Sequence, residues 1–294
     1  MSTLQSIALI GYGEVGQILA NDLHTGGIGR IAVWDTLFAD ARSGPSRALA
    51  SSPAQAATDA MAASAGAQLV ISAVTSAQTV AAAQAITALQ GAWFLDLNSV
   101  APQTKQAAAA HIEACGGKYV EGAVMAPISP KRSGTAILLG GPHAAAFVSV
   151  AHGVGLTGAQ FFSGEVGQAS AAKMCRSVIV KGLEALLGEC MLAAHSYGVT
   201  QSVVDSLRDL FPRNDWRAMA RYMIGRSLVH GTRRAEEMRE VARTLAAVGV
   251  EPRMSEACAR WQEWAPRHKA LADRQALEEL LEAMLAAGGA RGGR

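Results

Sequence analysis

The sequence predicts two domains, an α/β domain followed by an all-α domain, joined by one long interdomain helix. Short apolar runs alternate with helical patterns up to about residue 163, and beyond it only helical patterns are found. Charged residues are unevenly distributed, with 15 among the first 163 residues and 35 among the other 131. The length of 294 residues is also more than one hydrophobic core usually serves. We therefore expect a first domain at 1–163, a second at 164–287 and a flexible tail at 288–294.

The first domain contains runs of strand length that are apolar on both faces. Runs of this kind, separated by helices, are typical of a parallel sheet that helices cover on both sides. The expected strands are 6–10, 31–34, 69–74, 93–97, 118–124 and 135–140. One helix is expected over 14–24, and another begins with Pro102 in its first turn and ends near Gly116.

The second domain consists of helical patterns interrupted by proline and glycine. The expected helices are 166–196, 201–211, 214–230, 232–248, 253–264 and 270–286. The first of them is the interdomain helix. The last carries a stripe of leucine and methionine at helical spacing, from Leu277 to Leu285, which predicts packing against a core or a subunit.

Composition excludes several classes of protein. Half of the residues are hydrophobic, which is enough to form a folded core rather than a disordered chain. A net charge of +2 gives no field suited to nucleic acid, and no apolar run reaches the length of a membrane span. The N-terminus shows no signal-peptide pattern. The four cysteines are widely spaced and predict reduced, mostly buried thiols rather than a metal site. We expect a cytoplasmic protein whose partner is a small molecule, not nucleic acid or a membrane.

A glycine-rich segment follows the first expected strand and opens the first helix. Its glycines are Gly11, Gly13 and Gly16, in the pattern GxGxxG. The first permits a tight turn, the second lets the backbone approach a pyrophosphate, and the third brings the helix close to the strand. The N-terminus of the helix adds free N–H groups and a partial positive charge. Strand, glycine loop and helix together predict a dinucleotide-binding domain of the Rossmann type.

Asp35, at the end of the second expected strand, predicts the cofactor preference. It lies nineteen residues after Gly16, where a carboxylate would accept hydrogen bonds from ribose hydroxyls and would repel a 2′-phosphate. We therefore expect NAD, with NADP as the alternative because Arg42 lies within loop reach. The expected cofactor contacts are Gly11, Tyr12, Gly13, Glu14, Val15, Gly16, Asp35, Val74 and Thr75.

The interdomain helix carries a lysine among small and apolar residues. Lys173 is flanked by Ala172 and Met174, which favours desolvation of its ammonium group and, with it, a role in proton transfer. Ser177 follows one turn later and faces the same way. From composition alone, a solvated surface lysine is the alternative.

Three segments of the sequence resemble one enzyme family. The glycine pattern at 11–16 matches its N-terminal motif, the segment 96–102 (Asp-Leu-Asn-Ser-Val-Ala-Pro) resembles its substrate motif, and 167–173 resembles the segment with its catalytic lysine. On these residues the chain resembles the β-hydroxyacid dehydrogenase family, which includes 3-hydroxyisobutyrate, tartronate-semialdehyde and 6-phosphogluconate dehydrogenases. The resemblance implies a Rossmann-type domain plus a helical domain, usually in a homodimer. It also implies that Lys173 is the general base in oxidation and the acid in reduction, and that Asn98 and Ser99 orient the substrate.

Three positions depart from the family pattern. Met125-Ala126-Pro127 stands where the family has Ser-Gly-Gly, whose N–H groups hold the substrate carboxylate; Pro127 has no N–H, and Met125 is bulky and apolar. Ser177 stands in place of the usual asparagine. Val180 occupies the position of the acid found in decarboxylating members, which disfavours that chemistry. An imine or aryl-carbonyl substrate therefore stands as the alternative to a small hydroxyacid.

The C-terminal half resembles a domain of uncharacterised function found in phosphogluconate-dehydrogenase-like bacterial proteins, through segments 211–216 and 230–238. Arg213, Arg217 and Arg221 share one helical face, which predicts a solvated surface, with a cationic wall for a carboxylate substrate as the alternative. For His230 and Arg234 we expect either a role toward the substrate or subunit interface, or a solvated face balanced by glutamates.

The sequence thus predicts an NAD(P)-dependent oxidoreductase that transfers hydride between a nicotinamide cofactor and the hydroxyl-bearing carbon of a β-hydroxyacid-like or related alcohol. Lys173 is the expected general acid/base. The expected substrate contacts are Asn98, Ser99, Met125, Ser177, His230 and Arg234. The alternatives are an imine or aryl-carbonyl reductase on the same scaffold and a non-catalytic dinucleotide-binding sensor.

Overall fold

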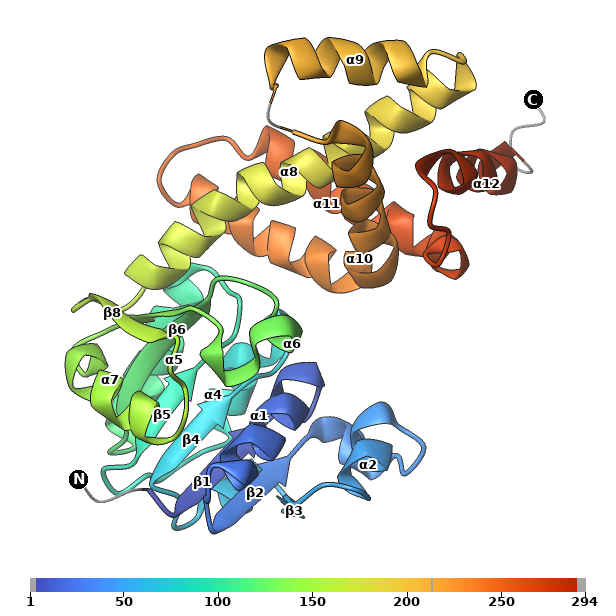
Figure 1. Ribbon diagram of the computed structural model, residues 1–294. Coiled ribbons are helices and arrows are strands. Elements are labelled where there is room, and N and C mark those ends of the chain that lie inside the picture. The colour runs from blue at the N-terminus through green and yellow to red at the C-terminus, as the bar shows by residue number, and fades with distance from the viewer. Residues whose placement is uncertain (1–3, 213, 290–294) are drawn as a thin grey trace. The chain divides into compact units, whose positions relative to one another are not determined.

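The computed structural model describes residues 4–212 and 214–289. The chain divides into two compact units, one up to Met174 and one from Cys175 onward (Figure 1). The division falls inside the long helix α8 (Gln168–Ser196), whereas the expected boundary at 163/164 lies before it. The difference has a physical reason, because a buried carboxylate of the sheet, Glu121, binds the first turn of α8.

The first unit is organised around an eight-stranded sheet in the order β3-β2-β1-β4-β5-β6-β7-β8. The strands are β1 (Ser6–Ile10), β2 (Arg30–Trp34), β3 (Gln55–Ala56), β4 (Leu69–Ser72), β5 (Trp93–Asp96), β6 (Lys118–Val124), β7 (Ile137–Gly140) and β8 (Ala159–Ser163). Neighbouring strands are parallel except β6 and β7, which are antiparallel. The strand order reverses between β1 and β4, and α/β sheets bind their ligands at the carboxyl ends of the strands at such a switch point.

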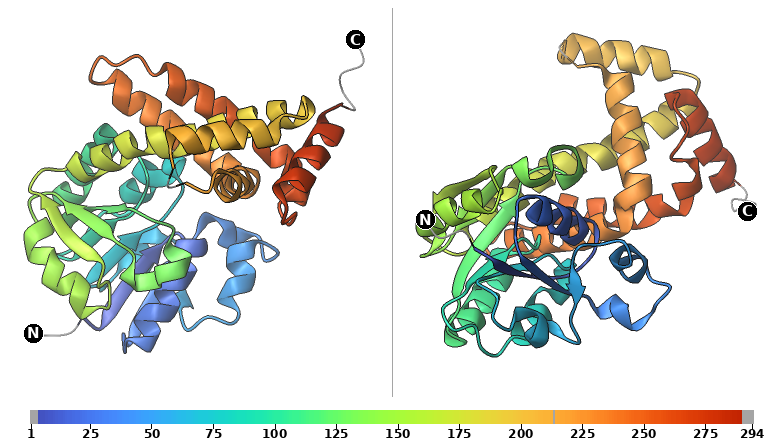
Figure 2. Two further views of the ribbon diagram at one scale, coloured as in Figure 1. Left: turned by 45° about the horizontal axis from the view of Figure 1, so that its top comes forward. Right: turned by 60° about the horizontal axis from the view of Figure 1, so that its bottom comes forward.

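Helices cover both faces of this sheet (Figure 2). They are α1 (Glu14–Thr25), α2 (Gly44–Leu49), α3 (Ala60–Ser64), α4 (Thr79–Gln84), α5 (Pro102–Ala114), α6 (Ile128–Lys131) and α7 (Ala144–Gly153), with short 3₁₀ turns η1 (Thr36–Ala39), η2 (Ser76–Gln78) and η3 (Arg132–Gly134). Alternate residues of β1 point to opposite faces. Ile7 and Leu9 join an apolar cluster with α1 and α7, whereas Ala8 and Ile10 join a second cluster with α3, α4 and α5. The predicted Rossmann-type class is confirmed.

All the predicted strands are present, and two strands were not predicted. β3 has only two residues. β8 lies at the edge of the sheet and contains Gln160, so the continuous apolar run that signals a central strand is missing from its sequence. The antiparallel β7 is also a departure from the predicted all-parallel sheet.

The second unit is helical, as predicted. After α8 it contains α9 (Thr200–Leu210), α10 (Trp216–Ala246), α11 (Arg253–Trp264), η4 (Ala265–Leu271) and α12 (Leu277–Gly289). Its apolar core joins α8, α9, α10 and α12, and the predicted stripe of α12 contributes the buried Leu277, Leu280, Leu281 and Met284. Within the described residues no helix is long and apolar enough to cross a membrane.

Two helix predictions need correction. The helices expected at 214–230 and 232–248 form one helix, α10, because Gly231 does not end it. A Cβ at Gly231 would lie 2.4 Å from the backbone oxygen of Gln262, so the glycine permits close packing against α11. The helix α12 continues through Gly289 and so includes the start of the expected tail, and 290–294 lie outside the described residues.

Candidate active site

The glycine loop between β1 and α1 has the geometry of a phosphate-binding turn. Gly11 has a φ of +96°, and a Cβ there would lie 2.4 Å from the backbone oxygen of Ala73. A Cβ at Gly16 would lie 2.2 Å from the backbone oxygen of Gly11, so helix and turn touch. A Cβ at the exposed Gly13 would meet nothing within 4 Å. The open backbone at Gly13, at the N-terminus of α1, therefore fits a pyrophosphate.

Asp35 connects the end of β2 to this loop. Its Oδ2 accepts a hydrogen bond from the N–H of Tyr12 at 2.7 Å, and its Oδ1 accepts one from Leu37 at 2.9 Å. A carboxylate has about four acceptor sites, so two remain for ribose hydroxyls. The buried ring of Tyr12 packs against Phe38, and its hydroxyl bonds Ser52. Tyr12 thus holds the glycine loop against the segment after β2.

A cavity of about 670 Å³ opens beside Asp35. Its lining residues are Trp34, Asp35, Thr36, Phe38, Ala39, Ala41, Ser46, Leu49, Ala56, Ala57 and Thr58, all within the described chain and none of them a cation. Arg42, the residue on which the NADP alternative rests, is 94% exposed and pairs with Asp40. The walls of this cavity therefore fit an uncharged group better than a phosphate.

The remaining expected cofactor residues lie around the same loop. Val74 follows β4, and its Cγ1 lies 3.0 Å from the position that a Cβ of Gly11 would take. Thr75 is exposed at the start of η2. Glu14 begins α1 and accepts a hydrogen bond from Ser129, and the next residue, Val15, packs half-buried against the apolar core.

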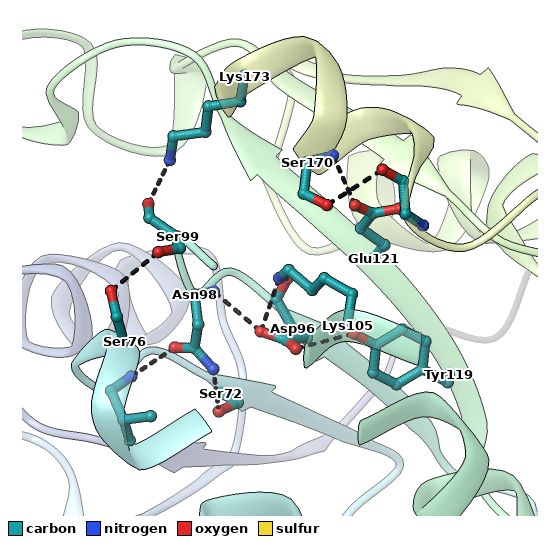
Figure 3. Close-up of polar contacts among 12 residues, drawn as sticks. Ser72, Ser76, Asp96, Asn98, Ser99, Lys105, Tyr119, Glu121, Ser170 and Lys173 are labelled. Carbon is teal, nitrogen blue, oxygen red and sulfur yellow. Dashed lines mark hydrogen bonds and ion pairs between the residues drawn. The ribbon is translucent and has the colours of Figure 1, made fainter. Parts of the chain in front are cut away.

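Lys173 and Ser99 meet at the carboxyl edge of the sheet (Figure 3). The Nζ of Lys173, in the second turn of α8, donates to the Oγ of Ser99 at 2.5 Å. Ser99 follows β5, and its backbone oxygen accepts from the hydroxyl of Ser76 at 2.8 Å. The structure therefore brings together a half-buried amine and a hydroxyl that the sequence places 74 residues apart.

Asn98 links this pair to the cofactor loop. Its Oδ1 accepts from the N–H of Val74 at 2.7 Å, and its Nδ2 donates to the hydroxyl of Ser72 at 3.0 Å. Asn98 is buried, so its amide ties the loop after β4 to the loop after β5. A continuous set of contacts thus runs from Gly11 through Val74 and Asn98 to the neighbouring Ser99. Direct contact between Asn98 and a substrate stays a prediction.

Three charged or polar residues near this pair were not predicted. Lys105 of α5 is fully buried, and its Nζ lies 2.9 Å from Asp96 Oδ1 and donates to the backbone oxygen of Asp96 at 2.8 Å. Tyr119 donates to Asp96 Oδ2 at 2.8 Å, and burial, together with the charge of Asp96, raises the pKa of Tyr119 well above its usual value. Glu121 of β6 accepts from the N–H groups of Gly167 and Ser170 at the start of α8. A lysine in an alanine-rich helix and an acid within an apolar strand are the sequence signals for such buried partners.

Met125 and Pro127 form the segment that departs from the family pattern. The N–H of Met125 donates to the backbone oxygen of Ala136 at 2.9 Å, and Pro127 precedes the short helix α6. Of the three residues that replace Ser-Gly-Gly, one has its N–H engaged and another has none. The half-buried Met125 adds an apolar side chain. Two of the three positions therefore offer no free N–H to a carboxylate.

Two of the expected substrate residues of the second unit, Ser177 and Arg234, have partners within that unit. The buried Ser177 accepts from Lys181, whose Nζ lies 2.8 Å from Glu237. Arg234 is 4% exposed and paired with Glu184, and burial lowers the pKa of its guanidinium. Arg234 therefore does not lie on a solvated face, and its role toward the substrate or a subunit interface stays a prediction. His230 is half-buried on α10.

The predicted solvated arginine face also needs correction. Arg217 pairs with Glu278 of α12, and Arg221 donates to the backbone oxygens of Ala272 and Arg274. Arg217 thus connects α10 to α12 through a carboxylate, and Arg221 connects α10 to backbone oxygens of the segment after η4. Arg213 lies outside the described residues.

The cysteines are free thiols, and two of them, Cys175 and Cys190, are exposed rather than buried as predicted. Across 4–212 and 214–289, His, Cys, Asp and Glu side chains form no group of three that could hold a metal ion.

Comparisons with known proteins agree with this architecture. Residues 6–164 match the NAD binding domain of 6-phosphogluconate dehydrogenase, and 194–265 match a domain of unknown function, DUF1932. A conserved hypothetical protein from Sinorhizobium meliloti 1021 is 34% identical, with a TM-score of 0.72 over 96% of this chain and 97% of that one. No curated protein matches the chain.

Two more distant structures share the fold. A 3-hydroxyisobutyrate dehydrogenase from Mycobacterium tuberculosis, solved with L-serine, is 16% identical with a TM-score of 0.72, over 96% of this chain and 99% of that one. An imine reductase from Streptomyces aurantiacus is 19% identical with a TM-score of 0.56, over 95% and 99%. The N-terminal match covers more than half of the chain, and it fits the glycine loop and Asp35 described above. The chain therefore belongs to the 6-phosphogluconate and β-hydroxyacid dehydrogenase family, has the NAD(P)-binding domain of that family, and represents a branch whose C-terminal helical domain is of unknown function.

Proposed function

We propose that the protein is an NAD(P)-dependent oxidoreductase that moves hydride between its nicotinamide cofactor and the hydroxyl-bearing carbon of a β-hydroxyacid-like or related alcohol. The observation that carries the proposal is the contact between Lys173 and Ser99, which the contacts of Asn98 and Val74 connect to the glycine loop. A half-buried amine beside a hydroxyl, next to a dinucleotide site, suits proton transfer to and from an alcohol oxygen.

The residues of the chain have defined parts in this reaction. The cofactor, when bound, supplies or accepts the hydride. In oxidation the neutral amine of Lys173 takes the proton of the substrate hydroxyl as its C–H bond breaks and a carbonyl forms. In reduction the ammonium returns that proton to the carbonyl oxygen. Ser99 accepts a hydrogen bond from Lys173 and can donate its own proton to the substrate oxygen, which fixes that oxygen near the amine.

Lys173→Ala tests this role. Loss of a general acid/base should lower kcat by about 10²-fold or more, with the Kd of the cofactor unchanged. The matched control is Lys269→Ala, which removes an exposed lysine of the second unit. Activity would be measured at the NADH absorbance with hydroxyacids, aryl alcohols and cyclic imines. A Lys173→Ala enzyme with wild-type kcat would refute the assignment.

The alternative is an imine or aryl-carbonyl reductase on the same scaffold. The observation that favours it is the segment 125–127, in which the N–H of Met125 donates to the backbone oxygen of Ala136 and Pro127 has no N–H. An uncharged substrate needs no carboxylate-binding N–H groups, and the Met125 side chain offers it apolar contact. Turnover of cyclic imines or aryl ketones, without turnover of any hydroxyacid in the panel, would favour this alternative.

The cofactor preference and the oligomeric state are further parts of the proposal. We propose NAD rather than NADP as the cofactor. The support is the carboxylate of Asp35 and the neighbouring cavity, whose lining residues include no lysine, arginine or histidine that could pair with a 2′-phosphate. We propose a homodimer, supported by the family relationship, in which Asn98, Ser99 and Met125 of the first unit face the substrate. NADH binding without turnover, together with a ligand-dependent mass change in light scattering, would instead indicate a dinucleotide sensor.

A further inference from the structure

Two fully buried carboxylates lie next to each other on neighbouring strands. Asp96 of β5 and Glu121 of β6 are paired in the register of the sheet, and both are 0% exposed. Burying a carboxylate costs free energy unless the group is paired and hydrogen-bonded, so the presence of two adjacent buried carboxylates calls for a structural or functional explanation. Neither belongs to the residues expected to contact substrate or cofactor. Figure 3 shows Asp96 bonded to Asn98, Lys105 and Tyr119, and Glu121 bonded to Ser170.

Asp96 holds the side of the site that carries Ser99. Its Oδ1 accepts from the N–H of Asn98 at 2.9 Å and lies 2.9 Å from the Nζ of Lys105. Its Oδ2 accepts from the hydroxyl of Tyr119 at 2.8 Å. The cation offsets the charge, and the N–H bond fixes the backbone one residue before Ser99.

Glu121 holds the side of the site that carries Lys173. Its Oε2 accepts from the N–H of Gly167 at 2.7 Å, and its Oε1 accepts from the N–H of Ser170 at 2.6 Å. These groups belong to the N-terminus of α8, whose partial positive charge offsets the carboxylate. The Glu121 carboxylate fits there because residue 140 is glycine: a Cβ at Gly140 would lie 2.5 Å from Glu121 Oε2. Lys173 follows Ser170 by three residues, on the next turn of the same helix.

We propose that Asp96 and Glu121 are positioning residues that together set the distance between Lys173 and Ser99. Each carboxylate fixes one member of the pair, and the ladder of β5 and β6 fixes the two carboxylates relative to each other. The inference rests on the proposed function for its kinetic consequence only. Misplacement of a catalytic group by about 1 Å can cost on the order of 10²-fold in rate.

The first experiment needs no activity. The full-length protein without cofactor is labelled competitively with acetic anhydride, and mass spectrometry gives the labelling rate of Lys173 relative to the exposed Lys269. Glu121→Gln keeps the shape but replaces one acceptor with a donor, so one N–H of α8 loses its partner. We expect Lys173 to be labelled several-fold faster, because its amine is no longer held against Ser99.

A second pair of variants covers the case in which Glu121→Gln does not fold. Ser170→Pro removes the N–H that bonds Glu121, in a first helical turn where proline is tolerated, and Ser170→Ala removes only the hydroxyl. Ser170→Pro should speed the labelling of Lys173, and Ser170→Ala should not. A further control is Asp59→Asn, which makes the same carboxylate-to-amide change at the N-cap of α3, where Asp59 accepts from the N–H of Ala62. Unchanged labelling of Lys173 in folded Glu121→Gln and Ser170→Pro would overturn the proposal.

The second experiment uses a double-mutant cycle. Glu121→Gln should lower kcat by about 10- to 100-fold with little change in KM, and should have no further effect when combined with Lys173→Ala. An equal loss in both backgrounds would mean that Glu121 does not act through Lys173. If the wild-type protein turns over no substrate, the proposed function fails while the labelling result still decides the positioning role.

Discussion

Gly13 and Gly16 belong to one loop, but alanine should have opposite consequences at the two positions. A Cβ at Gly13 would meet no atom within 4 Å, and its φ of −74° is one that alanine readily adopts. Alanine is a poorer helix cap than glycine, whereas it stiffens the unfolded chain, and each effect is about 1 kcal/mol or less. We therefore expect Gly13→Ala to change the free energy of unfolding by less than about 1 kcal/mol, which shifts Tm by no more than about 4 °C.

Cofactor affinity should respond differently to Gly13→Ala. The new methyl group would stand where the pyrophosphate approaches the backbone, and overpacking of this kind costs about 1–3 kcal/mol. The Kd for NADH should therefore rise by about 5- to 100-fold in calorimetric titration. Gly16→Ala is the contrasting variant, because its Cβ would lie 2.2 Å from the backbone oxygen of Gly11 and the fold itself should lose stability. Wild-type affinity in Gly13→Ala would refute the placement of the pyrophosphate at this loop.

Three further predictions concern residues around the same edge of the sheet. Asp35→Ser removes the carboxylate that repels a 2′-phosphate, so the ratio of NADP to NAD affinity should rise by about tenfold or more in Kd measurements; an unchanged ratio would contradict the role of Asp35. Lys105→Met should lower the free energy of unfolding in urea by about 3–5 kcal/mol, because it leaves the buried charge of Asp96 unpaired, and adding Asp96→Asn should restore part of the loss. Because the pKa of Tyr119 is raised in the folded protein, its protonated hydroxyl stabilises the fold below the ordinary tyrosine pKa of about 10, and this stabilisation is lost as the pH rises above about 10. Tyr119→Phe should therefore make the free energy of unfolding fall less steeply between pH 9 and 12. An equally steep fall in the variant would contradict the role of Tyr119.

The periodicity of the sequence predicts most of this fold because its strands are buried on both faces. The run 6–10 and the helix after it carry local signals that no distant contact changes. The prediction errors occur where a tertiary contact, rather than the local sequence, determines whether a helix or strand continues. Gly231 reads as a helix break in sequence, but its lack of a side chain serves the contact with Gln262 and Pro266. β8 was not predicted because Gln160 interrupts its short apolar run at the edge of the sheet.

The residues of the candidate site also fall into those that the sequence predicts and those that it does not. The glycine loop and Asp35 follow from spacing, since each stands at a fixed offset from a strand or helix. Lys173 is singled out by the resemblance of the segment 167–173 to that of a known enzyme family. Glu121 does not, because its partners Gly167 and Ser170 come more than forty residues later and bond it through backbone N–H groups, which every residue except proline has. An acid within an apolar strand indicates that Glu121 is buried, but no residue type in the sequence indicates which N–H groups it bonds.

The charge-poor composition of the first domain strengthens the case for these buried acids. Only eight carboxylate side chains occur among residues 1–163, and two of them, Asp96 and Glu121, are fully buried at the same edge of the sheet. One is offset by the ammonium of Lys105, the other by the N-terminus of α8. Replacing a buried ion pair with apolar groups is often neutral or stabilising, so stability alone gives little reason to keep both. What apolar side chains could not provide is a directional acceptor for the N–H groups next to Ser99 and before Lys173, and this is the physical basis for assigning the two carboxylates to the geometry of the reaction.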